Sequence, residues 1–420
     1  MKLNKVKLLL IAMCLPIVTA GCSTIKKDVL QTEVQQTVEK PEKVSLKLWG
    51  SSSDSDLLAT MVESFQKHYA SEADFDITME YVDESVCKDT ALKDVNNAAD
   101  VFAFAGDQLN TLAASGLIEK ISNEEQIKTQ NSENSVAEAS INQSLYAYPM
   151  TADNGYFMYY NKKYFKQKDL ETLDQMMAVA AANKKKITMN VEDAWYLYSF
   201  FGGTGLDLGV NDDYVTNYCD WNSKTKEIKG KDVGNALLSI LKNPGFSSVG
   251  EKDFLEGVRK GSVIAGVSGI WNADELQKIW GADYAAVKLP TYTVAGRQVQ
   301  MSSFSGYKML GVNSNSKQKA WAEKLAEWIT SQENQEYRFE VRGQGPSNKA
   351  AASSDLVKNS PAIKALLEQS EYAKLQYIGN NYWQAAEKFA IDIVNGKISK
   401  STMQEELDKM VKGITLPVTG

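Results

Sequence analysis

The chain has 420 residues, which is too long for one ordinary hydrophobic core and predicts two lobes. Its net charge is -7, with Lys and Arg spread along the chain, so the composition argues against a nucleic-acid partner. Acid–base catalysis and metal binding both depend on histidine, and His68 is the single histidine. The composition therefore argues against an enzyme and against a metal centre.

The first residues have the pattern of an export signal. Three lysines precede an apolar segment, 8–18, which has signal-peptide length and is too short for a comfortable membrane span. Small residues then lead to Cys22, a combination that resembles the lipobox of bacterial lipoproteins, although Thr19 stands where leucine is usual. We expect a signal peptide over 1–21 and lipid on Cys22, which would anchor an exported protein to the outer face of the membrane. A plain secretory signal is the alternative.

The next segment, 22–43, is polar and lacks aromatic residues, which predicts a flexible tether. Strand-like and helix-like patterns then alternate. They predict strands over 44–49, 77–81 and 100–104 and helices over 57–69, 92–97 and 109–117. Such alternation predicts a parallel α/β sheet, in which ligands lie beyond the carboxyl ends of the strands. Trp49, Phe104 and Asp107 stand at or just past strand ends.

The stretch 147–162 predicts a crossing from one lobe to the other. It begins as an apolar run, breaks at Thr151–Gly155 with small and polar residues, and resumes as an aromatic run. Two strand-like segments with a soft point between them suit such a crossing. One long strand with a bulge at Gly155 is the alternative. Asp153 and Asn154 lie in the soft point.

The remaining chain continues the alternation. It predicts strands over 187–190, 262–267, 284–290 and 305–312, helices over 164–184, 192–201, 254–260 and 320–329, and an almost wholly helical segment from 355 onward. Cys87 and Cys219 are the two cysteines outside the signal region. Export permits a disulfide between them but does not require one.

Aromatic residues gather where loops meet strands or helices. A flat aromatic face packs well against the C–H-rich face of a sugar, and short polar side chains bond its hydroxyls. For any one aromatic residue, a place in the core is the ordinary explanation; the set together favours a binding site. The aromatic members are Trp49, Phe104, Trp195, Tyr196, Trp271 and Trp383, and the polar members are Asp107, Asn154, Asp193, Asn272, Asn380 and Asn381.

Five segments resemble, in order and spacing, the extracellular solute-binding proteins of ABC sugar importers, in particular the maltose and maltodextrin type. They are 100–107, 147–162, 258–271, 288–290 and 382–383. The resemblance implies a two-lobe, periplasmic-binding-protein-like α/β fold with a hinge that the chain crosses three times and a helical C-terminal segment. It places 44–151 plus about 306–355 in the first lobe, and about 152–305 plus 356–420 in the second.

The same resemblance implies roles for single residues. Trp271 and Trp383 match aromatic platforms, and Trp195 and Tyr196 match a neighbouring aromatic pair. The polar matches are Asp193 and Asp107, as carboxylates that bond sugar hydroxyls, and Asp153 or Asn154, near a hinge glutamate; Phe104 replaces a tryptophan. Two positions depart from the family. A serine-rich loop with Asp54 replaces an Asp-Lys pair, and Gln108 replaces an arginine, so the sugar and its length stay open.

The sequence thus predicts a monomeric, lipid-anchored receptor, without cofactor or metal, that captures an oligosaccharide and hands it to an ABC permease. A maltooligosaccharide is the first expectation. One alternative is a surface glycoside hydrolase that uses Asp107, Asp193 or Glu192, although neighbours on one helix do not form an opposed acid–base pair. Another is a receptor for a non-sugar solute, such as iron held by Tyr159 and Tyr160, or a polyamine held by aromatic faces.

Overall fold

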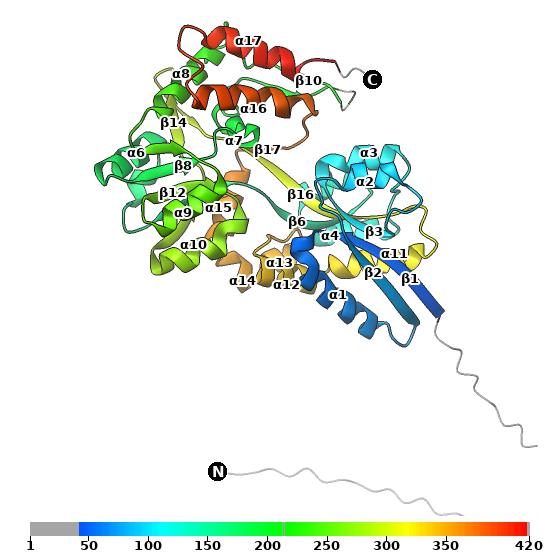
Figure 1. The fold of residues 1–420 in the computed structure, drawn as a ribbon. Coiled ribbons are helices and arrows are strands. Elements are labelled where there is room, and N and C mark those ends of the chain that lie inside the picture. The colour runs from blue at the N-terminus through cyan, green and yellow to red at the C-terminus, as the bar shows by residue number, and fades with distance from the viewer. Residues whose placement is uncertain (1–41, 212, 214, 418–420) are drawn as a thin grey trace, which may run out of the picture. The chain divides into compact units, whose positions relative to one another are not determined.

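The computed structural model describes residues 42–211, 213 and 215–417 (Figure 1). Two lobes are built in this part of the chain, each around its own β-sheet. The predicted signal peptide, Cys22 and nearly all of the tether lie outside the described residues. Glu42 and Lys43, the last residues of the predicted tether, already belong to the first strand. None of the helices in the described ranges has the length and apolar character needed to span a bilayer.

The first sheet has the strand order β17-β16-β3-β1-β2, and β6 also pairs with β16. Its strands are β1 Glu42–Gly50, β2 Ala73–Tyr81, β3 Val101–Ala105, β6 Tyr148–Gly155, β16 Ser303–Val312 and β17 Ala373–Leu375. Strand β1 runs parallel to β2 and β3, as the sequence predicts, whereas β16 runs antiparallel to β3. The carboxyl ends of β1, β2 and β3 therefore meet at one edge of this sheet.

Helices cover both faces of the first sheet. Figure 1 shows α1 (Ser55–His68) and α11 (Lys319–Ile329) on one face, with α2 (Cys87–Lys93) and α3 (Leu109–Ala114) on the other. The lobe also contains α4 Glu124–Gln130, α5 Glu133–Glu138, α12 Gln332–Arg342, and the small hairpin of β4 Ser140–Ile141 and β5 Ser144–Leu145. Because both faces are covered, the central strand β3 is buried along almost its whole length.

The second sheet has the order β11-β8-β12-β7-β13. Its strands are β7 Phe157–Asn161, β8 Lys186–Met189, β11 Phe246–Ser248, β12 Val263–Ser268 and β13 Tyr284–Val287. Strands β8, β11 and β12 are parallel, while β7 is antiparallel to β12 and β13. Two separate apolar cores lie against this lobe's strands, one on each side.

One core of the second lobe is covered by α9 Glu251–Arg259, α10 Ala273–Trp280 and α15 Pro361–Ser370. The other is covered by α6 Leu173–Ala182, α7 Ala194–Phe201, α8 Gly230–Leu241, α16 Asn381–Val394 and α17 Met403–Ile414. The remaining elements are α13 Lys349–Ala352, α14 Asp355–Lys358, and the hairpins of β9 Leu208–Val210 with β10 Asn217–Cys219 and of β14 Thr291–Val294 with β15 Arg297–Gln300. The prediction of an almost wholly helical segment from 355 onward is confirmed for its described residues, apart from the short strand β17 and the connecting loops.

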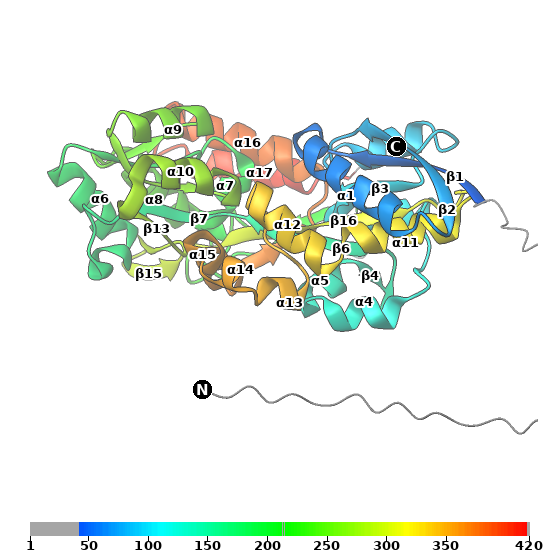
Figure 2. The ribbon, with the colours of Figure 1, turned by 90° about the horizontal axis from the view of Figure 1, so that it is seen from below.

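The predicted crossing is confirmed. Strand β6 pairs with β16 in the first sheet, and β7 belongs to the second sheet, with Tyr156 alone between them. Figures 1 and 2 show β6 and β16 side by side between the lobes. The break expected at Thr151–Gly155 is wrong, because the strand continues to Gly155 and absorbs the polar residues as register shifts opposite β16. We call β6 and β16 the hinge strands.

The helix expected over 92–97 is also wrong. Helix α2 ends at Lys93, and Asp94 leaves the helical region with φ −146° and ψ 77°. Its carboxylate accepts a hydrogen bond from Asn97 Nδ2 at 2.7 Å, so the two polar side chains favour a local turn over another helical turn. Both cysteines of the described region are free: Cys87 is buried and Cys219 is half-buried.

A buried charge network attaches α12 to the loop that follows β1. Asp54 is 3% exposed and pairs with Arg338, which is 1% exposed. Its other carboxylate oxygen accepts from Arg342 Nε at 3.0 Å, and Arg338 Nη1 also donates to Gln344 Oε1 at 2.9 Å. Because buried charges are tolerated only when paired, this network fixes a loop that carries two cavity residues, Ser51 and Ser53.

Replacing Arg338 by alanine tests this network. We expect Arg338→Ala to lower the free energy of unfolding by about 3 kcal/mol, measured by urea denaturation. We expect a loss at the low end of the range for breaking a buried ion pair. Two nitrogens of Arg338 have no hydrogen-bond partner among the described residues, so the wild-type arginine is itself incompletely satisfied. The matched control, Arg259→Ala, breaks an exposed pair with Glu275 and should cost under about 1 kcal/mol. Equal losses in the two variants would contradict the assignment.

Candidate functional site

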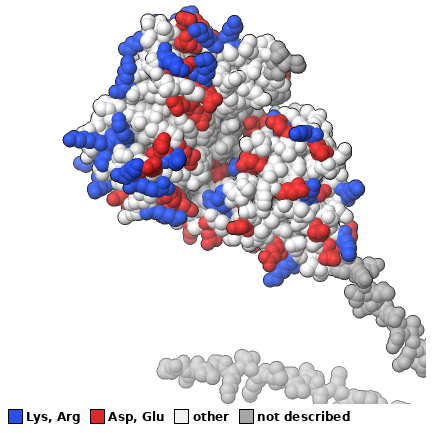
Figure 3. All heavy atoms as spheres, in the orientation of Figure 1, with Lys and Arg blue, Asp and Glu red and all other residues white. Residues whose placement is uncertain are grey.

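A cavity of about 650 Å³ lies between the lobes, and Figure 3 shows the hollow with acidic side chains at its edges. Both lobes and the hinge strands supply its walls. The first lobe contributes Ser51, Ser53, Asp83, Glu84, Ser85, Ala105, Asp107, Gln108, Arg342 and Gln344; the hinge strands contribute Asp153, Asn154 and Lys308; the remaining lining residues are Asp193, Trp195, Ile270, Trp271, Gln376 and Trp383. The first-lobe wall is polar, and the opposite wall is largely aromatic.

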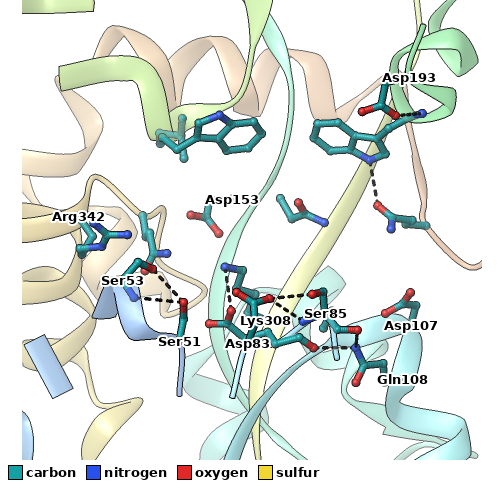
Figure 4. Close-up of a pocket in the computed structure, with 18 of the residues that line it drawn as sticks. Ser51, Ser53, Asp83, Ser85, Asp107, Gln108, Asp153, Asp193, Lys308 and Arg342 are labelled. Atoms are coloured by element: carbon teal, nitrogen blue, oxygen red, sulfur yellow. Dashed lines mark hydrogen bonds and ion pairs between the residues drawn. The ribbon is translucent and has the colours of Figure 1, made fainter. Parts of the chain in front are cut away.

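The polar wall is built at the carboxyl ends of parallel strands. Ser51 and Ser53 follow β1, Asp83–Ser85 follow β2, and Asp107 follows β3. Figure 4 shows Asp83, Ser85 and Lys308 on one side of the cavity, Asp193 on the other and Asp153 between them. This is the edge where open α/β sheets place their ligands, because neighbouring loops diverge there and leave a crevice.

Asp83 is a prepared hydrogen-bond acceptor in the polar wall. Its Oδ1 accepts from the backbone N of Ser85 at 3.0 Å and from Ser85 Oγ at 2.8 Å. The backbone hydrogen bond is the main reason that the pKa of Asp83 lies below its ordinary value. The carboxylate therefore stays ionised at neutral pH and keeps lone pairs for a ligand hydroxyl.

Gln108 braces this wall. Its Nε2 donates to the Glu84 carbonyl at 2.7 Å, and its Oε1 accepts from the backbone N of Lys88 at 2.9 Å. Its amide is therefore committed to the loop that follows β2. Gln108, which replaces the arginine of the resembling family, lines the cavity and orders the loop that carries Asp83 and Ser85.

Lys308 supplies a positive charge from the middle of hinge strand β16. Its Nζ lies 3.7 Å from Glu84 Oε2. Burial raises the pKa of Glu84, and the charge of Lys308 opposes that shift. The second cation of the lining, Arg342, is bonded to Asp54. Both cations thus face carboxylates of the first lobe.

Asp153 is the buried polar residue on hinge strand β6. It is 5% exposed, and its Oδ1 has no hydrogen-bond partner among the described residues. Burial raises the pKa of Asp153, and the charge of Lys308 opposes this. A buried oxygen without a partner costs free energy that a ligand hydroxyl or a water can recover.

The aromatic wall is held in place by polar contacts behind it. The rings of Trp195 and Trp271 lie 6.0 Å apart between centroids, with 31° between their planes. Trp195 Nε1 donates to Gln376 Oε1 at 2.9 Å, and the Trp195 ring meets Tyr156 edge-on at 4.5 Å. Trp383 is half-buried against Phe304. Trp271 is 44% exposed, so this ring offers the largest free surface of the three.

Gly269 is required beneath Trp271. A Cβ at this position would lie 1.9 Å from the Trp271 ring, which is closer than two carbon atoms can approach. The indole therefore lies directly against the backbone at the end of β12. No other residue type leaves that room, and any side chain here would displace the ring.

Residues 60–365 match the family model of bacterial extracellular solute-binding proteins. The chain belongs to this family. Such proteins act outside the cytoplasm, so this solute-binding protein is exported.

Relatives of this solute-binding protein span almost the whole chain. The galactooligosaccharide-binding protein of Bacillus subtilis (strain 168) is 24% identical over 388 residues, which cover 88% of this chain and 89% of the relative. A solved complex with acarbose is 29% identical, with a TM-score of 0.78 over 89% of this chain and 99% of the other. The maltodextrin-binding protein MalE1 of L. casei BL23, solved without ligand, is 26% identical, with a TM-score of 0.75 over 89% and 100%. The two-lobe fold expected from the resemblance is confirmed.

The structure brings together seven of the thirteen residues that the sequence singled out for ligand binding. Asp107, Asp153, Asn154, Asp193, Trp195, Trp271 and Trp383 line the cavity of this solute-binding protein. Asp193 also begins α7, where its Oδ1 accepts from the backbone N of Trp195 at 2.8 Å. Helix α7 therefore orients a carboxylate and a tryptophan toward the same space.

The other six lie elsewhere. Asn272 is buried, and Asn380 and Asn381 line a different cavity. Trp49 is 5% exposed and donates from Nε1 to Glu80 Oε2 at 2.7 Å, and Phe104 is fully buried in the first core. Both stand on central strands that helices cover, so their side chains enter the core. Tyr196 is buried behind Trp195 and lines a smaller cavity. Tyr159, considered above for iron, donates its hydroxyl to the Gly269 carbonyl at 3.0 Å within the core.

Sequence reasoning missed several residues of the polar wall. Ser51, Asp83 and Ser85 follow strand ends, so the rule that singled out Asp107 also applies to them. Lys308 is the one charged residue of β16, and a lone charge inside a largely buried strand is itself a signal. Arg342 lies in the last turn of α12, far along the chain, and no local pattern marks it.

Glu138 is a buried carboxyl group behind the Asp107 loop. It is 2% exposed, and a Cβ at Gly106 would lie 2.5 Å from its Oε1, so the loop packs directly on it. Burial, and then the charge of Asp107, raises the pKa of Glu138 to about 8. The group therefore keeps its proton in the folded protein at neutral pH, whereas an unfolded chain releases it near pH 4.5.

This difference predicts a pH dependence of stability. Between pH 4.5 and about 8 the folded state binds more protons at Glu138, so the free energy of unfolding falls as pH rises. In Glu138→Gln the side chain is neutral at every pH, so its free energy of unfolding does not fall with pH for this reason. We expect it to be more stable than wild type by about 3–5 kcal/mol at pH 8 and by little at pH 4.5, in urea denaturation at several pH values. Parallel curves for wild type and Glu138→Gln would contradict this, and the exposed control Glu227→Gln should follow wild type.

Proposed function

We propose that this solute-binding protein captures an oligosaccharide in the cavity between its lobes. The observation that carries the proposal is the contrast between the two walls. Trp271, Trp195 and Trp383 lie on one side, and Asp83, Asp107 and their neighbours lie on the other. A pyranose ring has the same two-sided chemistry, with C–H faces for aromatic rings and hydroxyl edges for carboxylates and amides.

Ligand binding would favour a closed arrangement of the lobes. A sugar that lies on the tryptophans alone uses one wall, whereas a sugar held from both walls also satisfies Asp153 and the carboxylates of the first lobe. Because the closed form makes both sets of contacts at once, the ligand shifts the population toward it. The join at Tyr156, between β6 and β7, is where such a rotation would be absorbed.

The further course of transport follows from membership of the family. We propose that the loaded protein acts as a monomer and delivers its sugar to an ABC permease, with lipid on Cys22 holding it at the outer face of the cell membrane. Neither step requires covalent chemistry from the cavity. We propose the same domain limits as the sequence predicts, with the first lobe over 44–151 plus about 306–355 and the second over about 152–305 plus 356–420.

A maltooligosaccharide is the first candidate ligand, supported by the two solved neighbours, one in complex with acarbose and one a maltodextrin-binding protein. A galactooligosaccharide is the second candidate, supported by the name of the curated relative. Both are neutral chains of hexoses, so the two-walled cavity suits either. The difference lies in how the hydroxyls of successive rings are presented to the polar wall.

Calorimetry separates the two candidates. We expect heat of binding with maltotriose or maltotetraose, with little or none for galactosyllactose at the same concentration. The opposite pattern would transfer the assignment to the galactooligosaccharide. Silence with both series would remove the oligosaccharide proposal itself.

A glycoside hydrolase would need two opposed carboxyl groups that act on one bond. Glu192 does not line the cavity; it accepts a hydrogen bond from Asn395 at 3.3 Å. Asp107 and Asp193 do line the cavity, but we expect no shortened products when the protein is incubated with maltotetraose and the mixture is analysed by chromatography. Accumulation of maltose or glucose at a steady rate would replace the binding proposal with an enzymatic one.

Replacing Trp271 by alanine tests the aromatic wall. We expect Trp271→Ala to weaken binding of the preferred sugar at least about 100-fold by calorimetry, because a fully used aromatic face contributes on the order of 3 kcal/mol. The folded state should persist, since the side chain is 44% exposed. The control is Trp280→Ala, a half-buried tryptophan in the same lobe that does not line the cavity, and it should leave the affinity unchanged. Unaltered affinity in Trp271→Ala would show that its exposed face is not used.

A further inference from the structure

A second cavity of about 180 Å³ opens beside the main one and lies wholly within the second lobe. We call it the annex. Its lining shares Asp193, Trp195 and Trp271 with the main cavity and continues to Thr188, Tyr196, Glu251 and Ser268. The three shared residues belong to the aromatic side of the main cavity, so the annex lies next to that wall.

The annex lies at the carboxyl ends of two parallel strands of the second sheet. Thr188 is on β8 and Ser268 ends β12, while Asp193 caps α7 and Glu251 begins α9. This is the second lobe's equivalent of the strand-end position that builds the polar wall in the first lobe. The fold therefore provides this lobe with a crevice of its own.

The polar groups of the annex are held in fixed positions. Asn272 Nδ2 donates to Ser268 Oγ at 2.9 Å and to Glu251 Oε1 at 2.6 Å. Ser268 is 2% exposed, and its side chain is also hydrogen-bonded to that of Tyr196. The annex thus presents a carboxylate acceptor, Glu251, that Asn272 holds in place.

Thr188, in the lining of the annex, has a buried hydroxyl group without a hydrogen-bond partner among the described residues. Its side chain is 2% exposed, and the unpaired atom is Oγ1. Buried hydroxyls in folded proteins are nearly always paired, with protein or with a bound molecule. Thr188 lines the annex, where a hydroxyl-bearing group would satisfy this hydroxyl.

The size of the annex sets the size of its occupant. A buried water needs on the order of 10–15 Å³ of such space, so the annex holds roughly a dozen water-sized groups, and a hexose unit has about that many non-hydrogen atoms. A second ring would not fit. Trp195 and Trp271 add aromatic surface to this polar pocket, as a sugar ring requires.

We propose that the annex binds one hexose unit that branches from the chain in the main cavity, most simply through a 1,6 linkage. Such a linkage starts at the exocyclic carbon and directs the extra ring away from the line of a 1,4-linked chain. This inference rests on the proposed function and names the part of the ligand that the main cavity leaves unaccommodated. Tyr196, which lies outside the main cavity, then contacts the branch.

Matched trisaccharides and variants test the annex. The probes are panose, which carries a 1,6-linked end unit, with maltotriose as its linear counterpart, and the 1,6-linked and 1,4-linked galactosyllactoses. Thr188→Val removes the orphaned hydroxyl with little change of shape, and Thr188→Ser retains it. Asn190→Trp places a large ring at the annex from a half-buried loop position. Circular dichroism melting confirms that each variant is folded.

We expect the wild type to bind the 1,6-linked member of the recognised pair. Thr188→Val should weaken that binding by about tenfold, as should Asn190→Trp, while Thr188→Ser should stay close to wild type. The 1,4-linked member should change by less than about twofold throughout. Equal effects on both members, or wild-type binding of the linear member alone, would overturn the annex proposal and leave the proposed function standing. If the wild type binds none of the four sugars, the proposed function fails and the annex proposal fails with it.

Discussion

Strand pairing along β16 is the constraint on which the rest of the molecule depends. This one strand pairs with β3 and β17 along one side and with β6 along the other, so it ties the first sheet to the crossing into the second. Tyr156, the single residue between β6 and β7, donates its hydroxyl to the Trp195 carbonyl at 2.8 Å. The crossing and the aromatic wall are therefore one connected structure. A rotation between the lobes must keep this pairing and act through the short joins beside it.

The hinge strands also form the part of the cavity between its two walls. Asp153, Asn154 and Lys308 come from β6 and β16, so the polar groups nearest the joins respond directly to the angle between the lobes. Lys308 lies close to Glu84 of the first lobe, and Asp153 has an oxygen without a partner. A ligand that satisfies Asp153 contributes where the lobes meet. Contact between the ligand and the hinge strands therefore couples sugar binding directly to the angle between the lobes.

The two walls divide the work of recognition. Aromatic rings contribute area and tolerate small shifts of the ligand, because dispersion and apolar burial have little directionality. Carboxylates and hydroxyls at strand ends are directional, so they select which hydroxyls face them. The aromatic contact area comes from helix starts and strand ends of the second lobe. The directional hydrogen-bonding groups come mainly from the strand ends of the first lobe. A change of sugar preference should therefore arise mainly from the first lobe.

The sequence predicted the fold well because its signals are local. The two strand-like runs of 147–162 predicted the crossing, although the break between them lies at Tyr156 and not at 151–155, and the aromatic residues near Gly269 and after Asp193 predicted most of one wall. The errors have a common physical cause. Trp49 and Phe104 stand at or near the ends of central strands, and periodicity does not distinguish a residue that enters the core from one that enters a cavity. Arg342 and Gln376 reach the cavity by tertiary packing over long sequence distances, which no local pattern contains.

A crystal structure of the protein with maltotetraose, or with the galactooligosaccharide if calorimetry selects it, tests the central claim most directly. The account predicts one sugar ring stacked on Trp271 and hydroxyls of the same ligand bonded to Asp83 or Asp107, so that both walls hold a single molecule. A ligand held by one lobe alone, or bound outside the cavity between the lobes, would contradict it.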